Sequence, residues 1–279
     1  MKLNPYLAII LGSTIGASSG VFIKLLNLPA TTITFFRMFI PVAVLLVYLL
    51  YKRTRLFRGN YPLMMLASGL NAARMFLFFI AFLYTTIGNA VIILYTWPVF
   101  AVIFSAIFLK EKVSRRTALL IALAFAGIVI MYAGKEISFG NQDFIGMAAM
   151  LGSAIIFSMT AVIFKRELVN YGKTETIFYQ NLLGAVVFLP FLFINRPLPT
   201  PVQASVASIY GFLIGIVAFV LFFYALKKLK MSHYSLFTYW EVPAALIFSA
   251  IFFREAITPN MVVGGGLILT AGILLRKGK

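Results

Sequence analysis

Apolar runs long enough to cross a lipid bilayer follow one another along this chain with only short connections between them. A helix needs about 20 mostly apolar residues to cross roughly 30 Å of hydrocarbon. Ten runs of suitable length fit the sequence, and we place them at residues 5–26, 31–51, 62–84, 88–109, 116–133, 143–166, 174–194, 203–226, 232–253 and 258–275. The sequence therefore predicts an all-α integral membrane protein with ten transmembrane helices and no extramembrane domain.

The composition excludes several classes of protein. Residues of the set AVILMFWYC make up 62% of the chain and charged residues only 11%, whereas a soluble domain averages about half apolar and a quarter charged. A soluble enzyme, a soluble nucleic-acid-binding protein and a disordered chain are thereby excluded. The chain has no cysteine and one histidine, His233, so we expect no metal and no cofactor. The expected partners are a small-molecule substrate and the lipid bilayer, with no nucleic acid, and the oligomeric state is left open.

The basic residues predict an orientation in the membrane. The chain has 24 Lys and Arg against 7 Asp and Glu, a formal net charge of +17. Of these 24 basic residues, 18 fall in the termini and in the connections on the same side as the amino terminus. Lys and Arg collect in cytoplasmic connections. We therefore expect a multi-pass protein with both termini in the cytoplasm, and we interpret the positive charge as topology rather than as a site for an anionic partner.

The chain also repeats itself. The segment from Tyr95 to Ser114 aligns with the segment from Tyr239 to Thr258, with FSAIF in common. The repeat predicts two units of five helices, at residues 1–136 and 137–279, within one membrane domain. Because five is odd, the second unit enters the membrane from the opposite side, so the two units are inverted. Inverted repeats are typical of transporters that expose a central site to each side in turn.

These features resemble the EamA family of the drug/metabolite transporter superfamily. The resemblance covers essentially the whole chain and includes the basic-Glu pairs Lys110-Glu111 and Arg254-Glu255, with the following Gly-containing span Ala126-Gly127-Ile128. It implies a small-molecule carrier, commonly an exporter of amino acids or related metabolites, with a central cavity lined by both repeats. It also implies the bacterial cytoplasmic membrane as the location.

Of the charged residues within the expected spans, Arg37, Arg74 and Glu241 lie farthest from the span ends. A charged residue near the centre of a span costs about 2.5–3.5 kcal/mol on insertion scales. By helical rise, Arg74 and Glu241 lie about 18 Å and about 14 Å from the cytoplasmic ends of their helices, so they can share a layer. Arg74 could bind a carboxylate or phosphate, and Glu241 could bind an ammonium group or carry a coupling proton. Alternatively the two form a buried structural ion pair. Arg37 could snorkel to the outer interface or join Lys24 in an outer vestibule.

Two prolines give a second indication of a site. Pro98 and Pro243 stand at corresponding places in the two repeats, and each is expected to break its helix. Interrupted helices at matched positions indicate a transporter's binding site. We therefore add to the candidate substrate-binding residues the aromatic side chains beside these prolines and one polar neighbour of Arg74, namely Tyr95, Trp97, Tyr239, Trp240 and Asn71. For the aromatic residues the alternative is an interfacial belt, and for Asn71 it is an interhelical hydrogen bond.

The sequence thus predicts a secondary transporter, not an enzyme, that exports a small polar or zwitterionic metabolite such as an amino acid by alternating access. No Gly-rich phosphate loop ending in Lys-Ser/Thr is present, so the energy must come from gradients or exchange. An uptake carrier or antiporter for a charged metabolite is the main alternative. A passive channel is a further one, although the inverted repeat argues against it.

Overall fold

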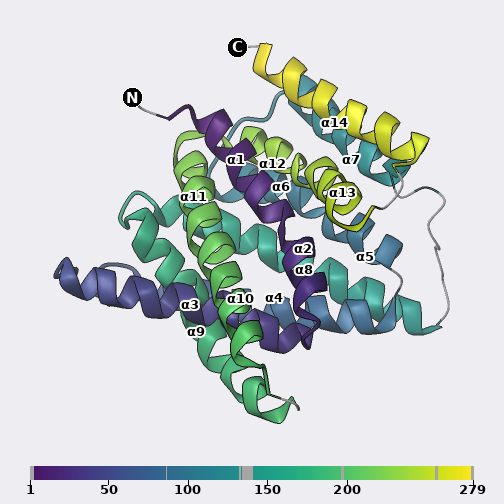
Figure 1. The fold of residues 1–279 in the computed structure, drawn as a ribbon. Coiled ribbons are helices and arrows are strands. Elements are labelled where there is room, and N and C mark those ends of the chain that lie inside the picture. The colour runs from purple at the N-terminus through teal and green to yellow at the C-terminus, as the bar shows by residue number, and fades with distance from the viewer. Residues whose placement is uncertain are drawn as a thin grey trace.

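The chain folds entirely into helices over the residues that its structure describes. The computed structural model describes residues 3–85, 87–131, 133, 141–195, 198–254 and 257–277. The elements are drawn in Figure 1 and are α1 (Pro5–Ala17), α2 (Ser19–Leu26), α3 (Ala30–Tyr51), α4 (Tyr61–Tyr84), α5 (Ile87–Leu94), α6 (Trp97–Phe108), α7 (Arg115–Met131), α8 (Asn141–Glu167), α9 (Lys173–Ile194), α10 (Pro201–Phe212), the π-helical segment η1 (Leu213–Ala218), α11 (Phe219–Lys228), α12 (Met231–Thr238), α13 (Glu241–Phe253) and α14 (Pro259–Lys277). The expected repeat boundary at residues 136 and 137 lies outside the described residues.

Local chemistry explains where some helices begin. Asn4 accepts a hydrogen bond from the backbone nitrogen of Tyr6 at 2.9 Å, directly before Pro5 at the start of α1. Thr200 and Gln203 form a reciprocal capping box around the start of α10. Such side chains satisfy backbone N–H groups that have no partner within the helix.

Eight of the described helical segments are long and apolar enough to cross a membrane. The remaining two expected spans correspond to shorter helices. These are α7, with 17 residues, and α14, whose apolar part is Pro259–Leu275. The prediction of an all-α, multi-pass membrane protein is confirmed, whereas helix length and composition account for eight spans rather than ten.

Two spans that we expected to be continuous are interrupted. The run 5–26 divides into α1 and α2 at Ser18, whose hydroxyl donates to the carbonyl of Ile15 at 2.6 Å. Such side-chain bonds compete with the helical ladder. The run 203–226 contains η1, where a Cβ on Gly215 would lie 2.3 Å from Cγ of Pro41 in α3. This close approach requires a glycine, and π-helical segments often mark functional sites.

The helices pack in pairs that combine the two halves of the chain. α4 packs along α8, α3 packs along α9, and α1 packs along α11. α7 and α14 lie side by side at the upper right of Figure 1. A Cβ on Gly127 would lie 2.7 Å from the carbonyl oxygen of Gly264, and a Cβ on Gly264 would lie 2.3 Å from that of Gly127. The two glycines therefore allow the backbones of α7 and α14 to touch.

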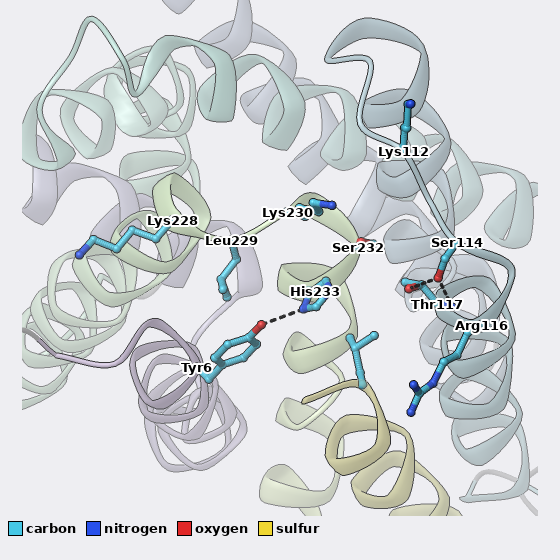
Figure 2. Close-up of a pocket in the computed structure, with 11 residues that line it drawn as sticks. Tyr6, Lys112, Ser114, Arg116, Thr117, Lys228, Leu229, Lys230, Ser232 and His233 are labelled. Carbon is cyan, nitrogen blue, oxygen red and sulfur yellow. Dashed lines mark hydrogen bonds between the residues drawn. The ribbon is translucent and has the colours of Figure 1, made fainter. Parts of the chain in front are cut away.

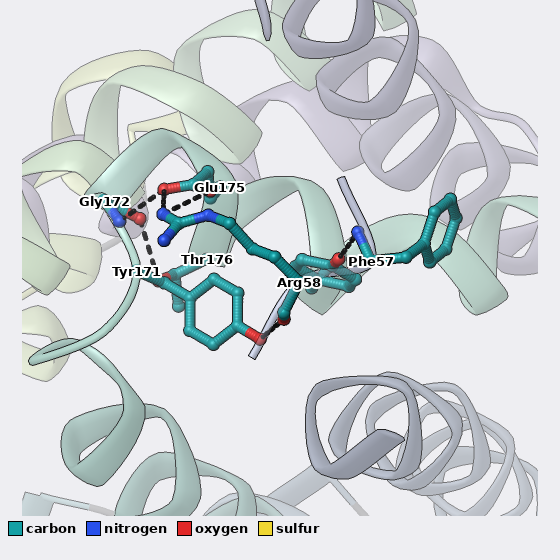
Figure 3. Close-up of polar contacts among 7 residues, drawn as sticks. Phe57, Arg58, Tyr171, Gly172, Glu175 and Thr176 are labelled. Atoms are coloured by element: carbon teal, nitrogen blue, oxygen red, sulfur yellow. Dashed lines mark hydrogen bonds and ion pairs between the residues drawn. The ribbon is translucent and has the colours of Figure 1, made fainter. Parts of the chain in front are cut away.

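One face of the bundle carries a network around Arg58 (Figure 3). The guanidinium of Arg58 donates to both carboxylate oxygens of Glu175, at 3.0 and 3.1 Å. The hydroxyl of Tyr171 donates to the carbonyl of Arg58, and burial raises the pKa of this hydroxyl, so it stays a neutral donor. The backbone nitrogen of Phe57 donates to the hydroxyl of Tyr179 at 2.9 Å. These bonds join the α3–α4 connection to the α8–α9 connection.

A second network on this face surrounds Glu111. One carboxylate oxygen of Glu111 pairs with Nζ of Lys165 at 2.6 Å, and the other accepts from the backbone nitrogen of Met231 at 2.7 Å. Nζ of Lys165 also donates to the carbonyl of Leu229 at 2.6 Å. The α6–α7 connection is thereby held against α8 and against the start of α12. In the related pair Arg254-Glu255, Glu255 lies outside the described residues.

Further contacts bring the ends of the chain to the same face. The hydroxyl of Tyr224 donates to the carbonyl of Leu3, and the ammonium groups of Lys173 and Lys228 lie over the Tyr224 ring, at 4.9 and 4.4 Å. We call this side the basic face, because it gathers the connections at residues 52–60, 109–114, 168–172 and 229–230 and the start of α1.

Candidate functional site

Arg74 lies in the interior of the bundle, on α4, and is held there by α4 and α9. Its side chain is 7% exposed. Its Nε donates to Oδ1 of Asn71 at 2.9 Å, and Nδ2 of Asn71 donates to the carbonyl of Gln180 in α9 at 2.9 Å. Asn71 is therefore an interhelical contact that also fixes the direction of the guanidinium.

The rest of the Arg74 guanidinium is without a protein acceptor. Its central carbon lies 4.2 Å from the ring centroid of Phe157 in α8, so the ring shields one face of the cation. In the part of the chain that the structure describes, neither terminal nitrogen has a hydrogen-bond acceptor. A guanidinium offers five N–H donors, and four of those of Arg74 have no acceptor among the residues that the structure describes. Such a group is suited to bind an anionic ligand in bidentate fashion.

Glu241 is the first residue of α13, directly after the break between α12 and α13. Its Oε1 would lie 3.0 Å from a Cβ on Gly16, so the absence of a side chain at Gly16 allows the carboxylate to pack against α1. The hydroxyls of Tyr210 and Tyr234 interact with it electrostatically. Over the described ranges the carboxylate has no hydrogen-bond donor and no ion-pair partner within 4 Å.

Arg37, on α3, is turned into the bundle. Its Nη1 lies 4.0 Å from Sδ of Met75, and its guanidinium lies 5.7 Å from the ring centroid of Phe219. Lys24 lies elsewhere, over the ring of Phe253 at 4.0 Å. Arg37 therefore contacts side chains of α4 and α11, whereas Lys24 contacts α13. We call Arg37, Arg74 and Glu241 the central charge cluster, because Arg37 interacts electrostatically with both of the others.

The structural ion pair that we considered for Arg74 and Glu241 is not present. Among the described residues, the ion pairs within 4 Å are Arg58–Glu175 and Lys165–Glu111. Arg74 and Glu241 thus approach the same charged neighbour, Arg37, without neutralising each other. Unpaired charges in a membrane interior are costly and typically mark a binding site or an ion path.

A row of aromatic rings leads away from Arg74. Trp97 is 5% exposed, and its ring centroid lies 4.8 Å from that of Phe157 and 6.5 Å from that of Tyr234. The carbonyl of Trp97 accepts a hydrogen bond from Ser158 at 2.7 Å. Trp97 is therefore an interior residue and does not belong to an interfacial belt. It borders the same Phe157 ring that shields Arg74.

The other three aromatic candidates make their side-chain contacts with neighbouring helices. Tyr239 is fully buried and its hydroxyl donates to the carbonyl of Tyr95 at 3.1 Å. Both rings pack with the apolar side chains of α7 and α14. Nε1 of Trp240 donates to Oγ1 of Thr14 in α1 at 2.9 Å. The hydrogen bonds of Tyr239 and Trp240 thus join helices: α12–α13 to the α5–α6 break, and α12–α13 to α1.

The helical path is interrupted at residues 95–96 and again at residues 239–240. Pro98 stands in the first turn of α6, and Pro243 stands in the first turn of α13. A proline in the first turn of a helix costs little, because the N–H group it lacks has no partner there.

Several contributors to the site escaped the sequence analysis. Phe157, Tyr210 and Tyr234 flank the charges, and we had assigned no role to them. The spacing of Phe157 from Ser153 could have indicated that both side chains lie on one face of the same helix, since residues four apart share a helix face. The hydroxyl of Ser153 donates to the carbonyl of Arg74 at 3.0 Å, so this face of α8 meets α4 where Arg74 is placed.

Comparison with known proteins identifies the family. The model of the EamA-like transporter family matches the chain twice, over residues 3–133 and over residues 144–276. The chain belongs to the EamA-like transporter family. The EamA resemblance inferred from the sequence is confirmed, and the relatives are named as transporters rather than as enzymes.

Three similar proteins illustrate the range of the relatives. An uncharacterized transporter of Archaeoglobus fulgidus is 25% identical, over 100% of this chain and 99% of its own. A pseudopaline exporter of Pseudomonas aeruginosa is 24% identical, over 91% of this chain and 88% of its own. A protein named probable terminal-alkyne amino-acid exporter, of Streptantibioticus cattleyicolor, is 28% identical over 67% of this chain and 63% of its own.

The fold has a counterpart among solved structures. A crystal structure superposes on this EamA-family chain with a TM-score of 0.82, covering 98% of this chain and 96% of the other. The two sequences are 18% identical, so the likeness concerns the fold alone.

Proposed function

We propose that this chain is a secondary transporter that exports a small zwitterionic metabolite, such as an amino acid, by alternating access. The observation that carries the proposal is the central charge cluster, in which Arg74 and Glu241 are interior, opposite in charge and not paired with each other. A zwitterion offers each of them a partner, with its carboxylate at Arg74 and Arg37 and its ammonium group at Glu241. A relative named as a probable terminal-alkyne amino-acid exporter supports this substrate class, and a relative named as a pseudopaline exporter supports export.

We further propose that the chain forms ten spans as two inverted repeats, at residues 1–136 and 137–279. The two family matches, over residues 3–133 and 144–276, support two units. The packing supports an axis between them, because α3 packs with α9 and α7 with α14, which are equivalent spans of the two units. The pairs α4–α8 and α1–α11 are then exchanged by the same axis. Inverted repeats permit two open states, one to each side of the membrane, that are related by a pseudo-two-fold axis through one central site.

We place the basic face in the cytoplasm of a bacterial cell and the protein in its cytoplasmic membrane. The argument is the concentration of Lys and Arg on this face together with the positive-inside rule. Both termini are then cytoplasmic. Glu241 is the proposed proton carrier, since it is the acidic residue of the central charge cluster and, among the described residues, has no cationic partner within 4 Å. Proton binding there would release an ammonium group and so couple export to the proton gradient.

Counterflow in proteoliposomes tests the function. Vesicles are loaded with unlabelled amino acids one at a time, and the uptake of a trace of the same labelled compound is followed. A carrier produces transient accumulation of label, because exchange is faster than net loss. Uptake that is linear in concentration and shows no transient would overturn the carrier and favour the passive channel. Glu241→Gln should bind the substrate more weakly, because the ammonium group loses its partner, should still exchange at high substrate concentration, and should lose its response to an imposed pH gradient. An unchanged response would contradict proton coupling through Glu241.

The place of Glu241 beside α1 gives a sharper prediction. Gly16→Ala would bring a Cβ to 3.0 Å from Oε1 of Glu241, whereas Gly20 on α2 has no atom within 4 Å of the corresponding position. We expect Gly16→Ala to displace the carboxylate by a few tenths of an ångström and to lower the apparent substrate affinity about tenfold. The measurement is the concentration dependence of counterflow, with Gly20→Ala as the matched control. Equal apparent affinities of Gly16→Ala and Gly20→Ala for the substrate would show that Glu241 is not part of the binding site.

A further inference from the structure

A pocket of about 430 Å³ opens on the basic face, apart from the central charge cluster (Figure 2). It lies between the first turn of α1, the start of α7, the end of α11, the start of α12 and the end of α14. Its lining includes Lys112, Arg116, Lys228, Lys230 and His233. Lys112 and Lys230 are exposed, and no acidic residue lines the pocket. The pocket therefore has the charge of a site for an anion.

The wall of the pocket also contains polar groups suited to a phosphate. Ser232 is 3% exposed and lines the pocket, yet its hydroxyl has no hydrogen-bond partner among the described residues. The residue stands in the first turn of α12. At the start of α7, Ser114 and Thr117 also line the pocket. Two helix starts and basic side chains thus line one space, which is suited to an anionic group such as a phosphate.

An apolar groove continues from this pocket along the same helices. The pocket contains Tyr6 of α1, His233 of α12 and Leu275 of α14. The groove, of about 150 Å³, is lined one to two turns farther on by Ile10 of α1, by Phe237 and Trp240, and by Gly272 and Ile268 of α14. Leu269 and Ile273 line it too and are 47% and 55% exposed. The groove therefore opens on the outer, lipid-facing surface of the bundle and does not lead to Arg74.

We propose that the pocket and the groove together bind one anionic phospholipid of the leaflet at the basic face, with its phosphate in the pocket and an acyl chain in the groove. The basic part lies at the end of the helices and the apolar part lies one turn deeper, which is the order of headgroup and chain in a bilayer. Basic pockets between membrane helices are suited to acidic headgroups. A soluble phosphate compound would use the pocket alone, so the groove favours a lipid. The proposal does not depend on the identity of the transported substrate.

Lipid titration followed by native mass spectrometry of the purified full chain tests the proposal. The probes are dioleoyl phosphatidylglycerol, dioleoyl phosphatidylcholine, and glycerol 3-phosphate as a headgroup without chains. We expect phosphatidylglycerol to bind at least about tenfold more tightly than phosphatidylcholine. The double variant Lys112→Gln/Lys230→Gln should lower the affinity for phosphatidylglycerol about thirtyfold, since each cation near the surface contributes roughly a factor of five. Lys52→Gln, which changes an exposed cation outside the pocket, should leave it unchanged.

A second pair of variants tests the groove. A Cβ on Gly272 would have its nearest neighbour at 3.9 Å, so Gly272→Leu fits the fold and fills the groove. Gly272→Leu should lower the binding affinity for both lipids and leave the binding affinity for glycerol 3-phosphate unchanged. Gly266→Leu, on the same helix with no atom within 4 Å, is the matched control. Equal binding of the two lipids would overturn the proposal, and so would equal effects of Gly272→Leu and Gly266→Leu. Binding of glycerol 3-phosphate as tight as that of phosphatidylglycerol would replace the lipid by a soluble phosphate compound.

Discussion

Replacing Arg74 with alanine should lower the apparent substrate affinity at least about thirtyfold and leave only a few per cent of the counterflow at substrate concentrations that half-saturate the wild type. The guanidinium is interior, is oriented by Asn71 and has two terminal nitrogens without a protein acceptor. Removing one partner of a desolvated charge pair costs about 2–5 kcal/mol, which corresponds to at least about thirtyfold in apparent affinity. Arg74→Lys keeps the charge but not the planar fork, so we expect it to recover only part of the affinity.

The control for Arg74 is Arg55→Ala, which removes an exposed arginine from the α3–α4 connection. Its counterflow should equal that of the wild type. Thermal unfolding in the same detergent distinguishes binding from folding. If Arg74→Ala and Arg74→Lys unfold at lower temperature yet retain the affinity of the wild type, Arg74 stabilises the bundle and the proposed substrate geometry is wrong.

The second large effect, a loss of folding stability, should follow from Glu111→Ala. Glu111 and Lys165 are 18% and 12% exposed, and Glu111 also accepts from the backbone nitrogen of Met231. The substitution leaves a poorly hydrated ammonium group without its carboxylate, and such losses cost about 3 kcal/mol. We expect the free energy of unfolding to fall by about this amount, measured by denaturation in sodium dodecyl sulfate with fluorescence of the two tryptophans.

The other ion pair on the basic face provides the comparison for Glu111. Arg58 pairs with Glu175, and the two side chains are 46% and 8% exposed. The carboxylate of Glu175 also accepts from the backbone nitrogen of Gly172 at 2.7 Å, so it keeps a donor when the half-exposed Arg58 is removed. Exposed pairs contribute about 0–1 kcal/mol, so Arg58→Ala should lower the free energy of unfolding by no more than about 1 kcal/mol. If the two variants are destabilised equally, burial does not determine the strength of these pairs.

The general class of this protein follows from its sequence for a simple physical reason. A bilayer requires a fixed length of apolar helix, so the spans can be located by counting, and the family resemblance rests on pairs such as Lys110-Glu111 that recur at a fixed interval. Interruptions within a span are harder to foresee. Neither the division at Ser18 nor the π-helical segment beside Pro41 follows from local composition, because both depend on which helix packs alongside.

The candidate site was predictable to a similar extent. Arg74 and Glu241 were recognisable because ionisable residues are rare within apolar runs, and the link of Arg74 to Asn71 follows from helical spacing. The inward direction of the Arg37 side chain could not be predicted, because a side chain near the end of a span can turn either way. In the structure it contacts Met75 and Phe219 on other helices. Trp240 was likewise grouped with Trp97 by sequence, although its indole bonds to α1.

The bond from the Tyr239 hydroxyl to the Tyr95 carbonyl lies where both α5–α6 and α12–α13 are interrupted. A buried hydroxyl that loses its acceptor costs about 1–3 kcal/mol, so neither interruption can change its angle alone without that penalty. The bond therefore acts as a mechanical linkage between the two bent helices. We expect both halves of the protein to reorient in one concerted step, which would keep the two sides of the membrane from being open at the same moment.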